Sequence, residues 1–211
     1  MNLNISKLYT ASDQSGCIDW SIAKRPKIGE EECGDDFLIK ICKTGVLIAV
    51  VDGLGHGKNA ATASRKAIDS LKNFNSDNPI SLVKDCHQNL KNTRGAVVSL
   101  AYIDCKEETI NWIGIGNVHG VLLKKGVSYQ HKENLYLRGG VVGYTLPVLQ
   151  SAMLPIVHGD TLVFHTDGVK RFYSDEISTK KKPNEITELI SNNNFLDSDD
   201  ALVLAARFKR K

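Results

Sequence analysis

The sequence predicts an α+β fold in which antiparallel strands are covered by a few helices. Three observations lead to this prediction. Residues 46–51 form an uninterrupted, mostly β-branched apolar run of strand length, which indicates a strand covered on both faces. Directly after it, apolar residues recur at helical spacing over 57–74. From residue 96 to residue 131, short apolar runs alternate with turns, which is the pattern of an antiparallel meander.

The other elements follow from the same signals, taken in chain order. Strands are predicted where short apolar, often β-branched runs lie between turn residues. These runs are at residues 5–9, 17–23, 37–42, 46–51, 96–103, 109–115, 118–123, 127–131, 148–153, 161–166 and 201–208. Helices are predicted at residues 57–74, 80–92, 169–173 and 183–192. Pro79 and Pro183 mark the starts of two of them, because proline is favoured in the first turn of a helix.

Length and charge limit the possible organisation and partners. A chain of 211 residues suffices for one domain with a sizeable core, so we expect a single domain over residues 1–211. The net charge of +3 is too small to indicate a nucleic-acid partner. No apolar stretch approaches the roughly 20 residues that span a bilayer, and the N-terminus lacks a secretory signal pattern. We therefore expect a cytoplasmic monomer without a membrane partner.

The five cysteines give no sign of a disulfide framework. Their number is odd, their positions are scattered, and none of them forms a CxxC pair. This arrangement predicts reduced thiols, in agreement with a cytoplasmic location.

Acidic residues stand at the ends of four predicted strands. Asp52 and Asp167 each end an apolar strand and are followed by Gly, whereas the pairs Asp35-Asp36 and Asp199-Asp200 each precede one. If the strands that end on an acidic residue run antiparallel to the strands that begin after one, all of these ends lie along one edge of the sheet. The sequence leaves open which member of each pair points toward that edge.

Converging carboxylates require cations to offset their repulsion. Oxygen ligands without neighbouring His or Cys favour magnesium or manganese over zinc. One Asp-Gly after a strand is most often a simple turn, and one acidic pair is most often a solvated loop. Two strands that end on Asp-Gly, together with two strands that begin after an acidic pair, favour a metal site.

Four motifs carry a resemblance to a known family. They are CGDDF at 33–37, VVDGLGHG at 50–57, HTDGV at 165–169 and SDDALVL at 198–204. They resemble the metal-binding motifs of the type 2C metal-dependent serine/threonine phosphatases, in particular their SpoIIE-like branch. The likeness covers the chain from about Cys33 to the C-terminus. It implies a four-layer αββα sandwich of two mainly antiparallel sheets flanked by helices.

The resemblance also implies the metal ligands and the chemistry. Two Mn²⁺ or Mg²⁺ ions would lie about 3.5–4 Å apart and activate a water that attacks phosphorus. Asp52 would bridge the ions, with Asp35 and the Gly53 carbonyl on one side and Asp167 and Asp199 on the other. Asp52, Asp167 and Asp199 would be the catalytic residues. The implied substrate is a phosphoserine or phosphothreonine protein, namely a STAS-domain regulator in a partner-switching stress pathway.

Two departures from the family pattern affect these expectations. Eukaryotic relatives have a His directly after the Asp-Gly, where this chain has Leu54, so His56 or water is expected to protonate the leaving group. The family's GDS turn, which helps to hold a third ion in some members, is here Gly116-Asn117-Val118, which indicates two ions only.

Two other functions are compatible with parts of the sequence. A phosphatase fold without turnover could act as a module that docks a signalling partner, but retention of all four acidic positions favours an enzyme. The glycines at 53, 55 and 57 resemble a nucleotide-binding loop only superficially. Their spacing is G-x-G-x-G, and the acidic residue precedes them instead of ending a following parallel strand.

Overall fold

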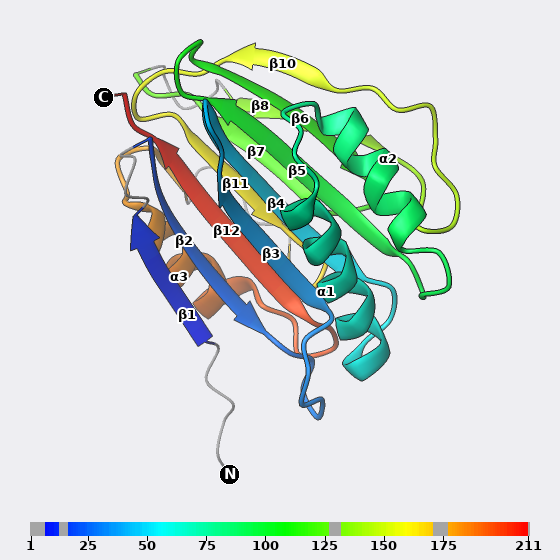
Figure 1. Cartoon of the computed structure of the whole chain (residues 1–211). Helices are drawn as coiled ribbons and strands as arrows, with labels where there is room; N and C mark the ends of the chain where they lie inside the picture. The colour runs from blue at the N-terminus through cyan, green and yellow to red at the C-terminus, as the bar shows by residue number, and fades with distance from the viewer. Residues whose placement is uncertain (1–6, 13–16, 127–131, 171–176, 211) are drawn as a thin grey trace.

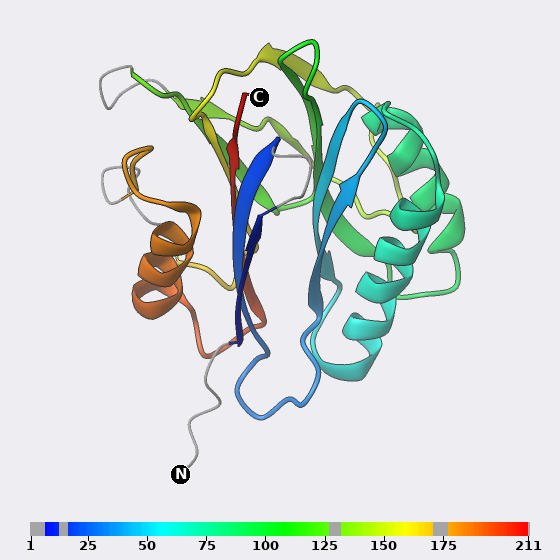
Figure 2. The same cartoon turned by 60° about the vertical axis from the view of Figure 1, so that its left-hand side comes forward.

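The computed structural model describes residues 7–12, 17–126, 132–170 and 177–210. Its strands form two sheets that face each other (Figures 1 and 2). In order across the first sheet, the strands are β1 (Lys7–Ser12), β2 (Ile18–Arg25), β12 (Ala201–Phe208), β11 (Thr161–His165), β7 (His119–Leu123) and β8 (Lys132–Asn134). Across the second they are β10 (Ala152–Pro155), β6 (Thr109–Ile115), β5 (Ala96–Asp104), β4 (Gly45–Gly53) and β3 (Asp35–Ile41).

Among the described residues, three helices cover the outer faces of the two sheets. The helices α1 (Gly57–Asn73) and α2 (Pro79–Asn89) pack on the second sheet, and α3 (Pro183–Asn194) packs on the first (Figure 2). The short strand β9 (Leu137–Arg138) pairs with β6 in parallel, whereas the other described strand pairs are antiparallel. The predicted α+β class and four-layer sandwich are therefore confirmed.

The uninterrupted apolar run in β4 reflects burial on both of its faces. Val46, Ile48 and Val50 belong to the core between the two sheets. The alternate residues Leu47 and Ala49 belong to the second core, beneath α1 and α2. Because successive strand side chains point to opposite faces, a strand in a middle layer needs apolar residues at every position.

Small residues allow α1 to lie close to the end of β4. Ala60, Ala63 and Ala67 are fully buried on the inner face of the helix. A Cβ atom added to Gly53 would lie 2.1 Å from the Ala60 carbonyl oxygen, so no other residue fits there without movement. This contact fixes the start of α1 directly beside Asp52.

The predicted meander is wrong at one turn. β5 and β6 are antiparallel neighbours as expected, but β7 pairs with β11 and β8 in the other sheet. Gly116, with φ +93°, and Asn117 therefore carry the chain from one sheet to the other. The sequence shows a two-residue turn, but it does not show whether that turn closes a hairpin or crosses between layers.

Two of the smaller predicted elements fall partly or wholly outside the described residues. The strand at 127–131 lies outside them, as do residues 171–173 of the expected short helix. In the described part of that helix, Val169 instead forms a β-bridge with Phe195. No helix among the described residues is long and apolar enough to cross a membrane.

The expectation of five reduced thiols is wrong for one pair. Cys17, just before β2, and Cys105, just after β5, form a disulfide with a Cα–Cα distance of 6.1 Å. The bond joins the two sheets across the central core. The two residues are 88 positions apart, so their spacing in the sequence gives no indication that they meet. Cys33, Cys42 and Cys86 are free.

Removing this disulfide should destabilise the fold. We expect Cys105→Ser to lower the free energy of unfolding by about 2–4 kcal/mol, because the bond closes a long loop of the unfolded chain. Urea unfolding measures the change, with Cys42→Ser as the control at a free cysteine. Dithiothreitol should destabilise the wild type and leave Cys105→Ser unchanged. Equal midpoints for the oxidised wild type and Cys105→Ser would contradict the prediction.

Candidate metal centre

The predicted meeting of strand ends occurs at one end of the sandwich. In the second sheet, Asp35 begins β3 and lies directly opposite Asp52, near the end of β4. In the first sheet, Asp167 follows β11, and Asp199 and Asp200 precede its antiparallel neighbour β12. Each sheet therefore brings acidic residues to the same end, and the edge predicted from the sequence is made by two sheets instead of one.

A cavity of about 370 Å³ lies between these strand ends. Asp52, Asp167 and Asp199 line it together, so the three predicted catalytic carboxylates share one space. The remaining wall is formed by Lys27, Leu54, Gly55, His56, Val97, Gly116, Asn117, Gly139 and Ser198. The site thus draws on segments from across nearly the whole chain.

The two facing carboxyls in the second sheet favour the protonated form. Burial raises the pKa of Asp52 to about 8, and the charges of Asp167, Asp199 and Asp200 add to this shift. Burial and then the charge of Asp52 raise the pKa of Asp35 well above its usual range. Carboxyls that face one another in a low-dielectric site ionise together only when a cation offsets their repulsion.

A side-chain amide holds the carboxylate of Asp167. The Asn117 amide nitrogen donates a hydrogen bond of 2.7 Å to Asp167 Oδ2. The pKa of Asp167 is nevertheless raised, first by burial and then by the charge of Asp199. The crossing turn that replaces the expected hairpin therefore has a role at the site, because it brings Asn117 to Asp167.

The structure shows that the two members of the first acidic pair, Asp35 and Asp36, have different surroundings. Asp35 is 1% exposed and interacts with Asp52, whereas Asp36 forms an ion pair of 3.0 Å with Lys24. Asp35 is therefore the member of the pair that faces the carboxylate cluster.

Both members of the second pair contribute to the cluster. Asp199 lines the cavity, and Asp200 is 3% exposed and acts electrostatically on Asp35 and Asp52. Asp200 Oδ1 accepts a hydrogen bond of 2.9 Å from the Lys27 backbone N–H. Its Oδ2 atom is buried and has no hydrogen-bond partner among the described residues. An unpaired buried carboxylate oxygen is costly, and a cation would satisfy it.

The oxygen atoms at this site are the kind of ligand that a hard divalent cation prefers. The cluster contains carboxylate oxygens, and the predicted Gly53 carbonyl stands at the end of β4 next to Asp52. Among the described residues, no three His, Cys, Asp or Glu side chains form a closed metal-ligand set.

Thr166 supports the cluster and was not singled out from the sequence. Its hydroxyl donates a hydrogen bond of 2.8 Å to Asp35 Oδ2 and accepts one of 3.0 Å from the Leu202 backbone N–H. Thr166 is fully buried directly before Asp167. A polar residue between an apolar strand and the Asp-Gly is the signal that could have identified it.

Two other side chains at the site differ in their chemistry. The Cys33 thiol is no candidate nucleophile, because burial and the charges of Asp35 and Asp200 raise its pKa. His56 lines the cavity, and its Nδ1 atom lies 2.6 Å from Glu30 Oε1. The imidazole is therefore held beside the carboxylates.

Known proteins similar to this chain have the same fold and related sequences. The Stage II sporulation protein E (SpoIIE) family matches residues 43–209. Phosphoserine phosphatase RsbX of Bacillus subtilis (strain 168) is 30% identical over 168 residues, which cover 79% of this chain and 80% of that protein. RsbX is also the protein whose size and motif order this sequence resembles, so that resemblance is confirmed.

Solved structures give the same result for the fold. A crystal structure of RsbX in complex with magnesium matches 96% of this chain and 100% of that chain, with 22% identity and a TM-score of 0.86. The phosphatase domain of SpoIIE from Bacillus subtilis matches 98% of this chain and 72% of that chain, with 16% identity and a TM-score of 0.74. With most of its length matched by the family, this chain belongs to the SpoIIE family of type 2C phosphatase domains.

Proposed function

We propose that this protein is a metal-dependent phosphoserine/phosphothreonine protein phosphatase that uses two Mn²⁺ or Mg²⁺ ions. The carboxylate cluster supports this proposal most strongly. Asp35, Asp52, Asp167, Asp199 and Asp200 interact at one end of the sandwich, and a buried oxygen of Asp200 is without a partner among the described residues. Such a cluster is stable in its ionised form only with bound cations.

We assign the ligands as the family motifs imply. Asp52 would be shared by the two ions, Asp35 and the Gly53 carbonyl would hold one of them, and Asp167 and Asp199 would hold the other. When bound, the ions supply positive charge that offsets the phosphate and activates water for attack on phosphorus. Asp52, Asp167 and Asp199 act as the catalytic carboxylates, since all three line the cavity that would receive the phosphate.

His56 is the side chain best placed to protonate the leaving group. It lines the same cavity as Asp52 and Asp167, two residues beyond the position where eukaryotic relatives have their His. The contact of Nδ1 with Glu30 orients the ring, as a carboxylate does for many catalytic histidines. General-acid catalysis of this kind contributes about 10²- to 10⁴-fold to a rate.

Loss of the Asn117 amide should weaken metal binding without unfolding the protein. We expect Asn117→Ala to lower the affinity for Mn²⁺ by about 10- to 100-fold, because Asp167 loses the hydrogen bond that orients it. Titration calorimetry measures this affinity, and circular dichroism monitors the fold. An unchanged affinity for Mn²⁺ would show that the Asn117 amide does not orient Asp167.

The proposed substrate is a phosphorylated STAS-domain regulator in a partner-switching stress pathway. The likeness to RsbX supports a phosphoserine substrate, because that relative is named a phosphoserine phosphatase. A structure described under the bacterial stressosome matches 90% of this chain with 28% identity and a TM-score of 0.82, which supports a stress-signalling context. We further propose a single domain over residues 1–211 that acts as a cytoplasmic monomer.

Hydrolysis of p-nitrophenyl phosphate and of a serine-phosphorylated STAS protein tests the proposal. We expect release of phosphate from both with Mn²⁺ or Mg²⁺, and none after EDTA. A chain that binds the phosphorylated STAS protein but releases no phosphate with either ion would be the non-catalytic docking module instead. Release of phosphate that persists in EDTA would exclude the metal mechanism.

A further inference from the structure

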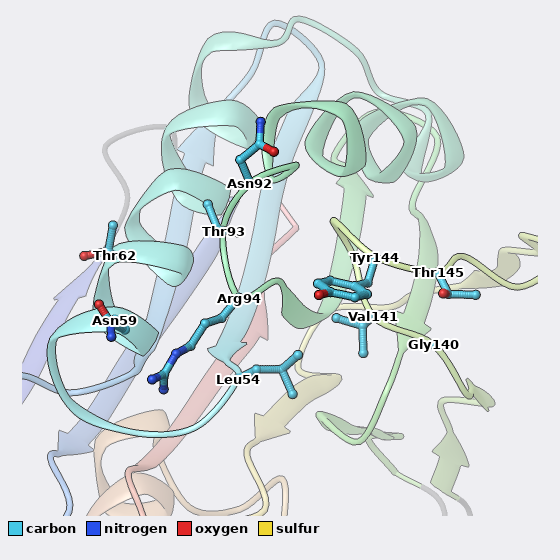
Figure 3. Close-up of a pocket in the computed structure, with 10 residues that line it drawn as sticks. All are labelled: Leu54, Asn59, Thr62, Asn92, Thr93, Arg94, Gly140, Val141, Tyr144 and Thr145. Carbon is cyan, nitrogen blue, oxygen red and sulfur yellow. The ribbon is translucent and has the colours of Figure 1, made fainter.

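A second, larger cavity adjoins the carboxylate site. It measures about 720 Å³ and is drawn in Figure 3. Its lining comes from the loop after β4, the first two turns of α1, the segment before β5 and the segment after β9. The lining residues are Leu54, Asn59, Thr62, Asn92, Thr93, Arg94, Gly140, Val141, Tyr144 and Thr145.

The two cavities meet at the loop after β4. Leu54 lines both of them, and Gly55 lines the carboxylate cavity. A Cβ atom added to Gly55 would lie 2.8 Å from Nη1 of Arg94, so the Arg94 guanidinium covers this loop. A polypeptide segment bound in the larger cavity would therefore continue directly into the carboxylate site.

The larger cavity combines an apolar wall with a cation. Leu54 and Tyr144 are large hydrophobic residues exposed at 38% and 74%, and the Val141 side chain lies next to the Tyr144 ring (Figure 3). Arg94 is exposed at the opposite side, near Asn59, and makes no ion pair with any described residue. Apolar side chains next to an available arginine suit a peptide with a large apolar residue and an acidic residue.

The wall that carries Tyr144 is fixed by backbone hydrogen bonds. Val142 exchanges two hydrogen bonds with Ala96 at the start of β5, with lengths of 3.0 and 2.8 Å. The Gly143 N–H donates to His87 Nδ1 of α2 at 3.0 Å, and the Thr145 N–H donates to the Val141 carbonyl. A surface that is ordered before binding loses less entropy when a partner binds.

We propose that this cavity is the docking site for the segment of the phosphoprotein substrate that flanks the phosphoserine. A large apolar side chain of that segment packs on Leu54, Val141 and Tyr144, and a carboxylate pairs with Arg94. The inference rests on the proposed phosphatase function and adds to it the residues that select the protein substrate.

Synthetic phosphoserine peptides and p-nitrophenyl phosphate together test the proposal. In an otherwise alanine peptide, one Phe and one Glu are moved stepwise away from the phosphoserine, and kcat/KM is measured with Mn²⁺. We expect the wild type to prefer peptides with Phe and Glu at particular distances from the phosphoserine. Tyr144→Ala should lower the ratio of kcat/KM for the best peptide to that for p-nitrophenyl phosphate about tenfold. Arg94→Gln should remove the preference for Glu.

Matched controls separate docking from general effects on the surface. Tyr136→Ala removes a tyrosine that is exposed to 76% and does not line the cavity, and Lys91→Gln removes an exposed cation near Arg94 in sequence. Neither control should change the ratio. Equal kcat/KM values for all peptides, or equal effects of Tyr136→Ala and Tyr144→Ala, would overturn the docking site while leaving the phosphatase function intact. Absence of hydrolysis of every substrate would overturn both.

Discussion

Asp52→Asn should lower metal-dependent hydrolysis of p-nitrophenyl phosphate by at least about a thousandfold. Asp52 faces Asp35 across β3 and β4 and lines the cavity together with Asp167 and Asp199, so it is the carboxylate shared by both sides of the cluster. Metal ions contribute several kcal/mol of charge stabilisation to such a reaction, and each 1.4 kcal/mol corresponds to about a factor of ten in rate. Initial rates over a range of Mn²⁺ concentrations measure the effect.

Asp36→Asn is the matched control for this substitution. Asp36 is an acidic residue in the neighbouring strand β3, next to Asp35, but it pairs with Lys24 away from the cluster. We expect its variant to retain the wild-type rate, and we expect Asp167→Asn to lose activity as Asp52→Asn does. If both Asp52→Asn and Asp167→Asn kept more than about a tenth of the wild-type rate, the two-ion mechanism would be wrong.

The second large effect concerns stability in the presence of a chelator. Burial and neighbouring charges raise the folded-state pKa of Asp52 from 3.8 to about 8, and that of Asp35 shifts in the same direction. Between these pH values the folded state binds more protons than the unfolded state, so the free energy of unfolding falls as pH rises. His165 has the opposite effect between about pH 4 and pH 6.5, because burial lowers its folded-state pKa to about 4.

The decrease of the free energy of unfolding with pH should therefore be clearest above pH 6.5, where His165 no longer opposes it. In EDTA, we expect the free energy of unfolding to fall by about 1–2 kcal/mol or more between pH 6.5 and pH 8, as measured by urea unfolding. Asp52→Asn should reduce this decrease and stabilise the protein at pH 8, whereas Asp36→Asn should keep it. Saturating Mn²⁺ should stabilise the wild type most at pH 8. Stability that rises over this interval in EDTA would contradict the electrostatic account.

Helices and strands could be predicted from the sequence where the spacing of apolar residues agrees with the residues that typically begin or end an element. The last strand was predicted at 201–208 and is observed there, and the helix predicted at 57–74 ends one residue earlier. Local signals do not show which layer a strand joins, so the Gly116-Asn117 turn was mistaken for a hairpin. Nor do they show which distant residues meet, so the disulfide between Cys17 and Cys105 was missed.

The site was predicted to a similar extent and for similar reasons. Acidic residues at strand ends identified Asp52, Asp167 and the two pairs Asp35-Asp36 and Asp199-Asp200, and the family motifs then implied Asp35 and Asp199. The structure brings these residues to one end of the sandwich. Their roles as metal ligands stay predictions. The hydrogen bonds from Thr166 and Asn117 could not be predicted, because each depends on how two elements far apart in sequence are placed. The same holds for Asp200, which is buried and accepts a hydrogen bond from the Lys27 backbone N–H.

The most direct test of the carboxylate cluster is anomalous scattering from a crystal of this protein soaked in MnCl₂. We predict two manganese peaks, with the Asp52 carboxylate between them and with Asp35 and Asp167 bound to different ions. A map with no manganese peak within coordination distance of Asp52, and with Asp52 and Asp167 each hydrated separately, would contradict the account.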